Sequence, residues 1–181
     1  MKKNLLLVFV WTITLSAQEG RLIPNPIRNI PRWVRAEYTA QGLDARYVIL
    51  FKLYPNYLRG DFNGDGKRDA VIQVQEEESG KVGLMIFHSK QNPQMLRNPI
   101  TVLGAGKSMS SAGDDLKWMD MWSLLTRRGV SALEPGAKLP PFKGDALRIE
   151  KRGERGGVIY WDGKKYVWHQ LPKPRVSQPK K

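Results

Sequence analysis

The sequence predicts an α+β fold: a single β-rich domain built mostly from antiparallel hairpins, with a minor helical part. Several short runs rich in β-branched and aromatic residues are separated by turn sequences, as is typical of antiparallel strands. An Asp-Gly pair stands between the last two runs and is a strong hairpin signal. The chain of 181 residues is long enough for one domain with a real core and short for two.

The N-terminus has the order of segments found in a secretory signal peptide. Two lysines precede a mostly apolar run over residues 4–15, and a Ser-Ala pair ending at Ala17 supplies small residues for cleavage. The run is too short to span a bilayer as a mature helix, and no later stretch is apolar enough to do so. We therefore expect a signal peptide at 1–17 and a secreted or periplasmic protein. An uncleaved N-terminal anchor is the alternative.

The composition narrows the classes of function. The chain has no cysteine, so an exported form would carry no disulfide and no lipid on an N-terminal cysteine. The formal charge is +13, and part of it lies in a proline-rich tail at 172–181 that we expect to be disordered. A basic balance favours adhesion to polyanions, whereas no recognition fold for nucleic acid is evident. We expect no specific nucleic-acid partner.

For the segment that follows the predicted signal peptide, the sequence predicts a lead-in and a short helix rather than strands. Residues 18–31 hold three prolines within eight residues, which argues against a helix or a central strand and predicts an extended lead-in. From Arg32 to Gln41 the apolar spacing allows a short helix, and Gly42 is a suitable stop. We expect the domain itself to span 32–171.

Strands are predicted wherever β-branched and aromatic residues cluster or alternate with polar ones. The predicted strands cover 46–53, 70–75, 82–87, 100–103, 145–150, 157–161 and 166–170. The stretch 116–125 is rich in tryptophan and apolar on more than one face, so its periodicity does not decide between a buried helical turn and a strand. Residues 133–142 contain three prolines and are predicted to form a loop.

The most specific motif is the nine-residue stretch DFNGDGKRD, which begins at Asp61. Oxygen-bearing side chains fall at its positions 1, 3, 5 and 9 with a glycine at position 6, so a curled loop can turn several oxygens toward one Ca²⁺. Position 12 is Ile72 rather than a glutamate, which excludes an EF-hand. Five residues are the expected ligands: Asp61, Asn63 and Asp65 through side-chain oxygens, Lys67 through its backbone carbonyl, and Asp69, which closes the site.

The electrostatics of this stretch also favour a cation. Three carboxylates within nine residues repel one another unless a cation lies between them, so an empty loop is costly to order. The alternative is an Asn-Gly and Asp-Gly turn that binds no ion.

With its flanking residues, Gly60-Asp61-Phe62-Asn63-Gly64-Asp65-Gly66-Lys67-Arg68-Asp69-Ala70-Val71 resembles the calcium loop of FG-GAP/VCBS-type repeats. Such repeats occur in integrin-α-like propellers and in many secreted bacterial proteins. The resemblance implies that the matching aspartates, the asparagine and one backbone carbonyl bind Ca²⁺ between two strands. The chain has a single such loop, whereas a propeller needs several repeats, so we expect no full propeller. Stretches 113–118 and 160–166 resemble small single-loop secreted bacterial proteins of unassigned function.

Catalytic motifs are weaker. The only two histidines, His88 and His169, stand in predicted strands, where histidines are more often packed or exposed than catalytic. Asp114 and Asp115, with Glu150 or Asp145, suggest carboxylates for glycoside hydrolysis, but the adjacent residues Asp114 and Asp115 point apart on a strand or helix. A loop or cap leading into Leu116 is the more ordinary interpretation of this pair.

These observations support one leading hypothesis and two alternatives. The leading hypothesis is an exported calcium-binding domain of non-enzymatic, adhesive or interaction role, whose partner is an unknown protein, envelope component or glycan. Calcium would order the loop before the strand at 70–75. The alternatives are a secreted hydrolase that uses Asp114 or Asp115, and a polyanion- or glycan-binding module. The latter would use the basic and aromatic surface of the last hairpin, although most of its aromatic side chains are expected to fill the core.

Overall fold

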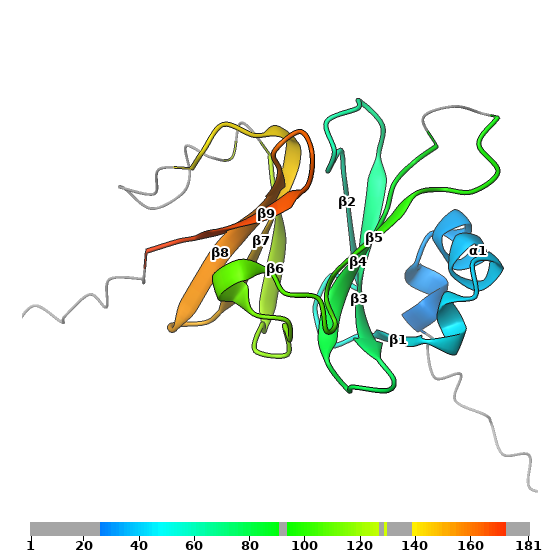
Figure 1. Cartoon of the computed structure of the whole chain (residues 1–181), viewed down its shortest axis with the longest axis horizontal. Coiled ribbons are helices and arrows are strands. Elements are labelled where there is room, and N and C mark those ends of the chain that lie inside the picture. The colour runs from blue at the N-terminus through cyan, green and yellow to red at the C-terminus, as the bar shows by residue number, and fades with distance from the viewer. Residues whose placement is uncertain (1–25, 91–93, 127–128, 130–138, 173–181) are drawn as a thin grey trace, which may run out of the picture.

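The computed structural model of the chain describes residues 26–90, 94–126, 129 and 139–172 (Figure 1). The predicted signal peptide and nearly all of the predicted tail lie outside these residues, as does most of the loop predicted at 133–142. In the described part of the chain, no helix combines the length and the apolar character needed to cross a membrane.

The secondary structure of the described residues consists of short helical segments and nine strands. The helical segments are η1 (Pro26–Asn29), α1 (Arg32–Ala40), η2 (Leu43–Ala45) and η3 (Ser110–Ala112), of which only α1 is an α-helix. The strands are β1 (Tyr47–Leu50), β2 (Tyr57–Gly60), β3 (Asp69–Glu76), β4 (Val82–Phe87), β5 (Ile100–Gly104), β6 (Met121–Leu125), β7 (Lys143–Lys151), β8 (Arg155–Trp161) and β9 (Tyr166–Gln170).

The strands form two antiparallel sheets. The first sheet has five strands in the order β1-β3-β4-β5, with β2 also paired to β3, and the second has four strands in the order β6-β7-β8-β9. Helix α1 covers the face of the first sheet that is turned away from the second sheet (Figure 1). The described residues form neither a closed barrel nor a propeller, and the predicted β-rich, mostly antiparallel fold with minor helix is confirmed.

The predicted helix is confirmed. The prediction of an extended lead-in before it is wrong at residues 26–29, within the part of the lead-in that the structure describes. Val34 and Tyr38, four residues apart, are the buried side chains of α1, and Gly42 follows the helix in a left-handed conformation. Residues 26–29 of the lead-in form a helical turn instead of an extended segment. A proline is tolerated at the start of a helical turn because its missing N–H has no partner there. Ile30, which follows this turn, is buried beside α1 in the core of the first sheet.

The edge of the first sheet differs from its prediction. The strand predicted at 46–53 ends at Leu50, and a second short strand, β2, pairs with the other half of β3. Segment 51–56, which contains Pro55, separates these two strands. Proline donates no ladder hydrogen bond, so it divides the edge strand in two.

The strand β3 is buried on both faces, rather than half-buried as its alternating pattern predicts. Val71 packs in the core between the two sheets, while Ala70, Ile72 and Val74 pack under α1. A third cluster, which includes Ala146, covers the outer face of the second sheet. The stretch 116–125, which the sequence left open, forms a turn and then the strand β6.

Candidate metal centre

The loop Asp61–Asp69 lies between β2 and β3, at the edge of the first sheet that faces the second. The pairing of Gly60 with Asp69 brings the two ends of the loop together, so the eight residues between this pair must curl tightly. Gly64 and Gly66 have positive φ angles of 74° and 84°, which side chains disfavour. The local sequence therefore folds as predicted for a curled loop.

The polar side chains of the loop hydrogen-bond its own backbone. The N–H of Asp65 donates both to Asp61 Oδ1, at 3.0 Å, and to Asn63 Oδ1, at 3.1 Å. Asp61 Oδ2 accepts from Gly66 N at 2.9 Å, and Asp65 Oδ1 accepts from Lys67 N at 2.8 Å. The Asn63 amide donates to Asp65 Oδ2 at 3.1 Å. Side-chain oxygens of three predicted ligands are thus gathered around a few backbone atoms.

Asp69 has a different environment from the other acidic residues of the loop. Its side chain is fully buried, and Oδ2 accepts hydrogen bonds from Phe62 N at 3.1 Å and His88 Nδ1 at 3.2 Å. Its Oδ1 accepts from Ser89 N at 2.9 Å. Asp69 therefore joins the start of the loop to the end of β4. Its predicted role of closing an ion site stays a prediction.

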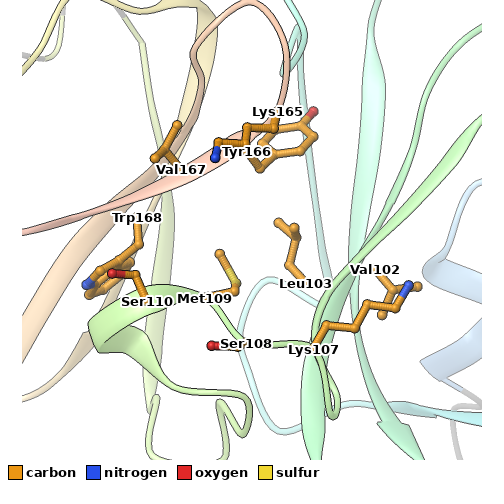
Figure 2. A pocket seen from close by; sticks show the side chains of 10 residues that line it. All are labelled: Val102, Leu103, Lys107, Ser108, Met109, Ser110, Lys165, Tyr166, Val167 and Trp168. Atoms are coloured by element: carbon orange, nitrogen blue, oxygen red, sulfur yellow. The ribbon is translucent and has the colours of Figure 1, made fainter.

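His88 extends this contact into the neighbouring strand. A carboxylate only accepts, so His88 Nδ1 donates to Asp69, and Nε2 of the neutral ring can accept from the Thr101 hydroxyl at 3.3 Å. An acid, a histidine and a hydroxyl in a row resemble a nucleophilic triad. Neither Thr101 nor His88 is among the residues that line the cleft shown in Figure 2. The row links β3, β4 and β5.

The loop is also docked on the second sheet. The N–H of Asp145 donates to the carbonyl of Asp61 at 2.6 Å, and the N–H of Asp61 donates to Asp145 Oδ2 at 3.0 Å. These bonds lie at an irregularity in the β7–β8 pairing between Lys143 and Leu147. Gly144 lies directly against the loop, where a side chain would overlap the carbonyl oxygen of Asp61. The loop is therefore a junction between the two sheets.

Tyr166 approaches the same junction from β9. Its ring stacks on the ring of His88, with centroids 5.9 Å apart and an interplanar angle of 15°. Its buried hydroxyl has no hydrogen-bond partner among the residues that the structure describes, and Figure 2 shows the oxygen pointing toward the first sheet. Burial raises the pKa of Tyr166, and the negative charges of Asp69, Asp61 and Asp65 raise it further. The field of the three carboxylates therefore reaches the second sheet.

Among the described residues, the acidic side chains of the loop have few basic partners, of which His88, beside Asp69, is one. Although the chain has 30 Lys and Arg residues, no described Lys or Arg forms an ion pair with Asp61, Asp65 or Asp145. No three described His, Cys, Asp or Glu side chains are grouped as a metal site. An ion at this loop would therefore depend on the Asn63 amide oxygen and on backbone carbonyls such as that of Lys67, in addition to two carboxylates. Ca²⁺ accepts such mixed oxygen ligands.

The other sequence candidates lie elsewhere. The Asp114 carboxylate pairs with the Lys81 ammonium at 2.5 Å, and this hydrogen bond lowers the pKa of Asp114. Asp115 accepts from the backbone N–H groups of Val82 and Lys117, each at 3.0 Å. The two carboxylates therefore accept hydrogen bonds from different donors.

The aromatic side chains mostly pack. Trp118 and Trp168 make an edge contact at 6.1 Å and lie against the core between the sheets. A cleft of about 240 Å³ opens beside Trp168, between β5 and β9 (Figure 2). Lys107 and Lys165 are the charged residues that line it.

Four residues at the loop junction were not predicted from the sequence: His88, Ser89, Asp145 and Tyr166. Their contacts join segments that are distant in the sequence, such as the pair Asp61 and Asp145, which are 84 residues apart. No local pattern identifies such neighbours.

Comparison with known proteins identifies no relative: no protein-family model matches the chain, and neither a curated protein nor a solved structure is similar to it. The likeness to FG-GAP/VCBS calcium loops thus rests on the loop residues alone. Function has to be argued from the geometry of the site.

Proposed function

We propose that the chain is an exported, non-enzymatic calcium-binding domain with an adhesive or interaction role. Ca²⁺ is held by the side chains of Asp61, Asn63 and Asp65 and by the carbonyl of Lys67, and Asp69 anchors the end of the loop. One observation carries the proposal: carboxylate and amide oxygens gather on a curled loop, and among the described residues neither Asp61 nor Asp65 forms an ion pair with a Lys or Arg side chain. Clustered carboxylates are destabilising without a counter-charge, and a hard cation supplies it.

The ion would act on more than its own loop. The loop is hydrogen-bonded to Asp145 and lies against Gly144, both in β7, so a fixed loop also fixes the second sheet on the first. In an exported chain without disulfides, such a clamp replaces a covalent constraint. Calcium thereby stabilises the surfaces through which the domain meets its partner.

The hydrolase alternative receives no support from the placement of Asp114 and Asp115, whose oxygens are held by Lys81 and by backbone N–H groups. General acid–base hydrolysis of a glycoside needs two carboxyl groups that face one bond.

A thermal melt in EGTA, in CaCl₂ and in MgCl₂ tests the proposal. Extracellular sites of this kind bind with a Kd on the order of 10⁻⁴ to 10⁻³ M. At about 10 mM CaCl₂ the ion should stabilise the fold by roughly 1.4–2.7 kcal/mol, since only the folded loop binds it. For a chain of this size that is a rise in Tm of about 3–10 °C. Equal melting in EGTA and CaCl₂ would contradict the proposal.

A pair of matched variants makes the test specific. Asp65→Asn removes one ligand charge and should abolish most of the calcium-dependent rise in Tm. Asp162→Asn is the control, because Asp162 also accepts backbone N–H bonds in a tight turn, from Lys164 at 2.7 Å and Lys165 at 2.9 Å. The control should keep the full response to calcium. Hydrogen exchange adds a spatial readout: protection of β6–β9 should fall more in EGTA than that of β3 and β4.

A further inference from the structure

A second charged site lies on the opposite side of the first sheet from the loop junction. A cleft of about 450 Å³ runs between helix α1 and the ends of β2, β3 and β4. Arg59, Arg68 and Lys90 line it, together with Trp33 and a single acidic residue, Glu37. The charged side chains of the cleft thus sum to a net positive charge of two.

The strand register explains why the two arginines meet here. Arg59 pairs with Ala70, which packs in the core cluster under α1, and both guanidinium groups belong to exposed residues. Arg68 lies two residues before Ala70, so its side chain points to the same side of the sheet as that of Ala70. Both side chains therefore emerge on the helix-covered face, where they line the cleft together with Trp33, Ala36 and Glu37 of α1.

These cations have no counter-ion within the described part of the chain. Between described residues, no ion pair involves Arg59, Arg68 or Lys90, and Lys90 Nζ makes a long contact of 3.4 Å to the Leu96 carbonyl. Glu37 accepts a hydrogen bond from Gln41 at 2.9 Å and neutralises none of the three. Unpaired guanidinium groups in one cleft suit a planar or tetrahedral oxyanion, which they bind through paired N–H donors.

The walls of the cleft are held by hydrogen bonds. The Ser89 hydroxyl donates to the carbonyl of Arg68 at 2.5 Å, which fixes the backbone that carries one guanidinium. The buried Asn98 donates to the His88 carbonyl at 2.7 Å, and its own carbonyl accepts from Gln41 at 2.9 Å. These bonds tie the end of α1 to the end of β4, so the cleft does not need a ligand to keep its shape.

We infer that this cleft binds a sulfate or phosphate group carried by a saccharide. The two arginines and Lys90 would hold the oxyanion, and the adjoining sugar ring would lie against Trp33. A cleft of about 450 Å³ is larger than one oxyanion requires, which favours an anion attached to a ring over a free inorganic ion. The inference concerns the partner of the domain, and its readout, the binding of a saccharide, is separate from the calcium-dependent rise in Tm.

Calorimetric titration of the full chain with a sulfated dextran oligosaccharide tests the inference, with neutral dextran as the uncharged probe. The double variant Arg59→Gln/Arg68→Gln should weaken the Kd at least about tenfold, since each lost charge-assisted contact exceeds 1 kcal/mol. The matched control is Lys107→Gln/Lys165→Gln, which removes two charges from the other cleft, shown in Figure 2. It should change the Kd by less than about twofold.

A third variant separates guanidinium recognition from charge. Arg68→Lys keeps the charge but loses the paired donors, so its Kd should fall between those of the wild type and the double variant. Both arginines are exposed, and unchanged thermal melts would show that the variants fold. Tight binding of neutral dextran, or equal losses in the cleft variant and in the control, would overturn the inference. Stronger arginine-dependent binding to anionic phospholipid vesicles than to the oligosaccharide would also overturn it, because the ligand would then be a lipid surface.

Discussion

The two sheets differ in how completely apolar layers cover them. We interpret the first sheet as the firmly packed part of the molecule and the second sheet as the part whose position depends on the first. All six residues of β4 are buried, whereas no residue of β9 is. The first sheet lies between α1 and the second sheet, so each of its faces meets an apolar layer (Figure 1). The second sheet has the first sheet on one side and only a small cluster on the other.

The two sheets also differ in the polar and charged groups that they carry. The first sheet carries the loop Asp61–Asp69 and the cationic cleft at the same end, since Arg68 belongs to both, and the second sheet contributes Asp145 and Tyr166 to the loop. A well-covered sheet can hold polar groups in fixed positions, because its backbone has few alternative arrangements. The second sheet then depends on the junction for its position.

A core truncation in each sheet gives the largest expected contrast. Phe87→Ala removes a fully buried ring that makes an edge contact with Trp33, and it should cost about 3–5 kcal/mol of unfolding free energy. Val167→Ala, in the half-covered strand β9, should cost less than about 1.5 kcal/mol, because part of its side chain already meets water. Urea denaturation measures both values. Similar losses would mean that the second sheet is as firmly packed as the first.

A glycine pair tests the junction itself. Gly144 and Gly153 have nearly equal φ angles of 72° and 74°, but a Cβ at Gly153 would meet open space, whereas one at Gly144 would overlap Asp61 and lie 2.7 Å from Gly64 N. Gly153→Ala should therefore cost only the left-handed strain of about 1–2 kcal/mol. Gly144→Ala should cost at least about 2 kcal/mol more, because the loop must move away from β7.

Urea denaturation again gives the comparison between the two glycine variants. An equal cost for both would mean that the loop is not held against the second sheet. A larger cost for Gly144→Ala, together with a weakened response to calcium, would join the stability of the junction to the ion site.

The elements that could be predicted from the sequence are those that carry their own signal. The hairpin of β8 and β9 follows from Asp162-Gly163 between two aromatic strands, and β3 with β4 follows from two apolar runs around a polar turn. By contrast, β2 has only four residues and no clear alternation, and it becomes a strand because β3 offers it an open edge. Strand β6 likewise takes its conformation from pairing with β7.

The candidate site divides in the same way. Asp61, Asn63 and Asp65 are close in sequence, and their spacing alone predicts the curled loop. The burial of Asp69 depends on Ser89 and His88, which reach it only after β3 and β4 have paired. Side chains that meet only through tertiary structure leave no local sequence pattern. The contacts of Asp145 and Tyr166, from the second sheet, could therefore not be predicted.

The smallest expected effect compares one tyrosine from each side of the molecule. The Tyr38 hydroxyl, in α1, donates to the carbonyl of Tyr47, whereas the buried Tyr166 hydroxyl has no partner. In EGTA, where no ion occupies the loop, Tyr38→Phe should cost about 1 kcal/mol for its lost hydrogen bond. Tyr166→Phe should be neutral or stabilising by up to about 1 kcal/mol, because it removes an unsatisfied polar group.

Alkaline titration gives the same comparison a second readout. Burial raises the pKa of Tyr38 to about 12, and burial also raises that of Tyr166, with smaller contributions from nearby carboxylates in each case. A raised pKa means that the fold favours the neutral phenol, so this stability is complete below the ordinary value of about 10 and is lost as the pH rises above it. Tyr166→Phe should remove one late-ionising tyrosine from the absorbance titration and reduce the alkaline loss of stability. If it does neither, the Tyr166 hydroxyl is open to water, and the carboxylates of the loop do not reach it.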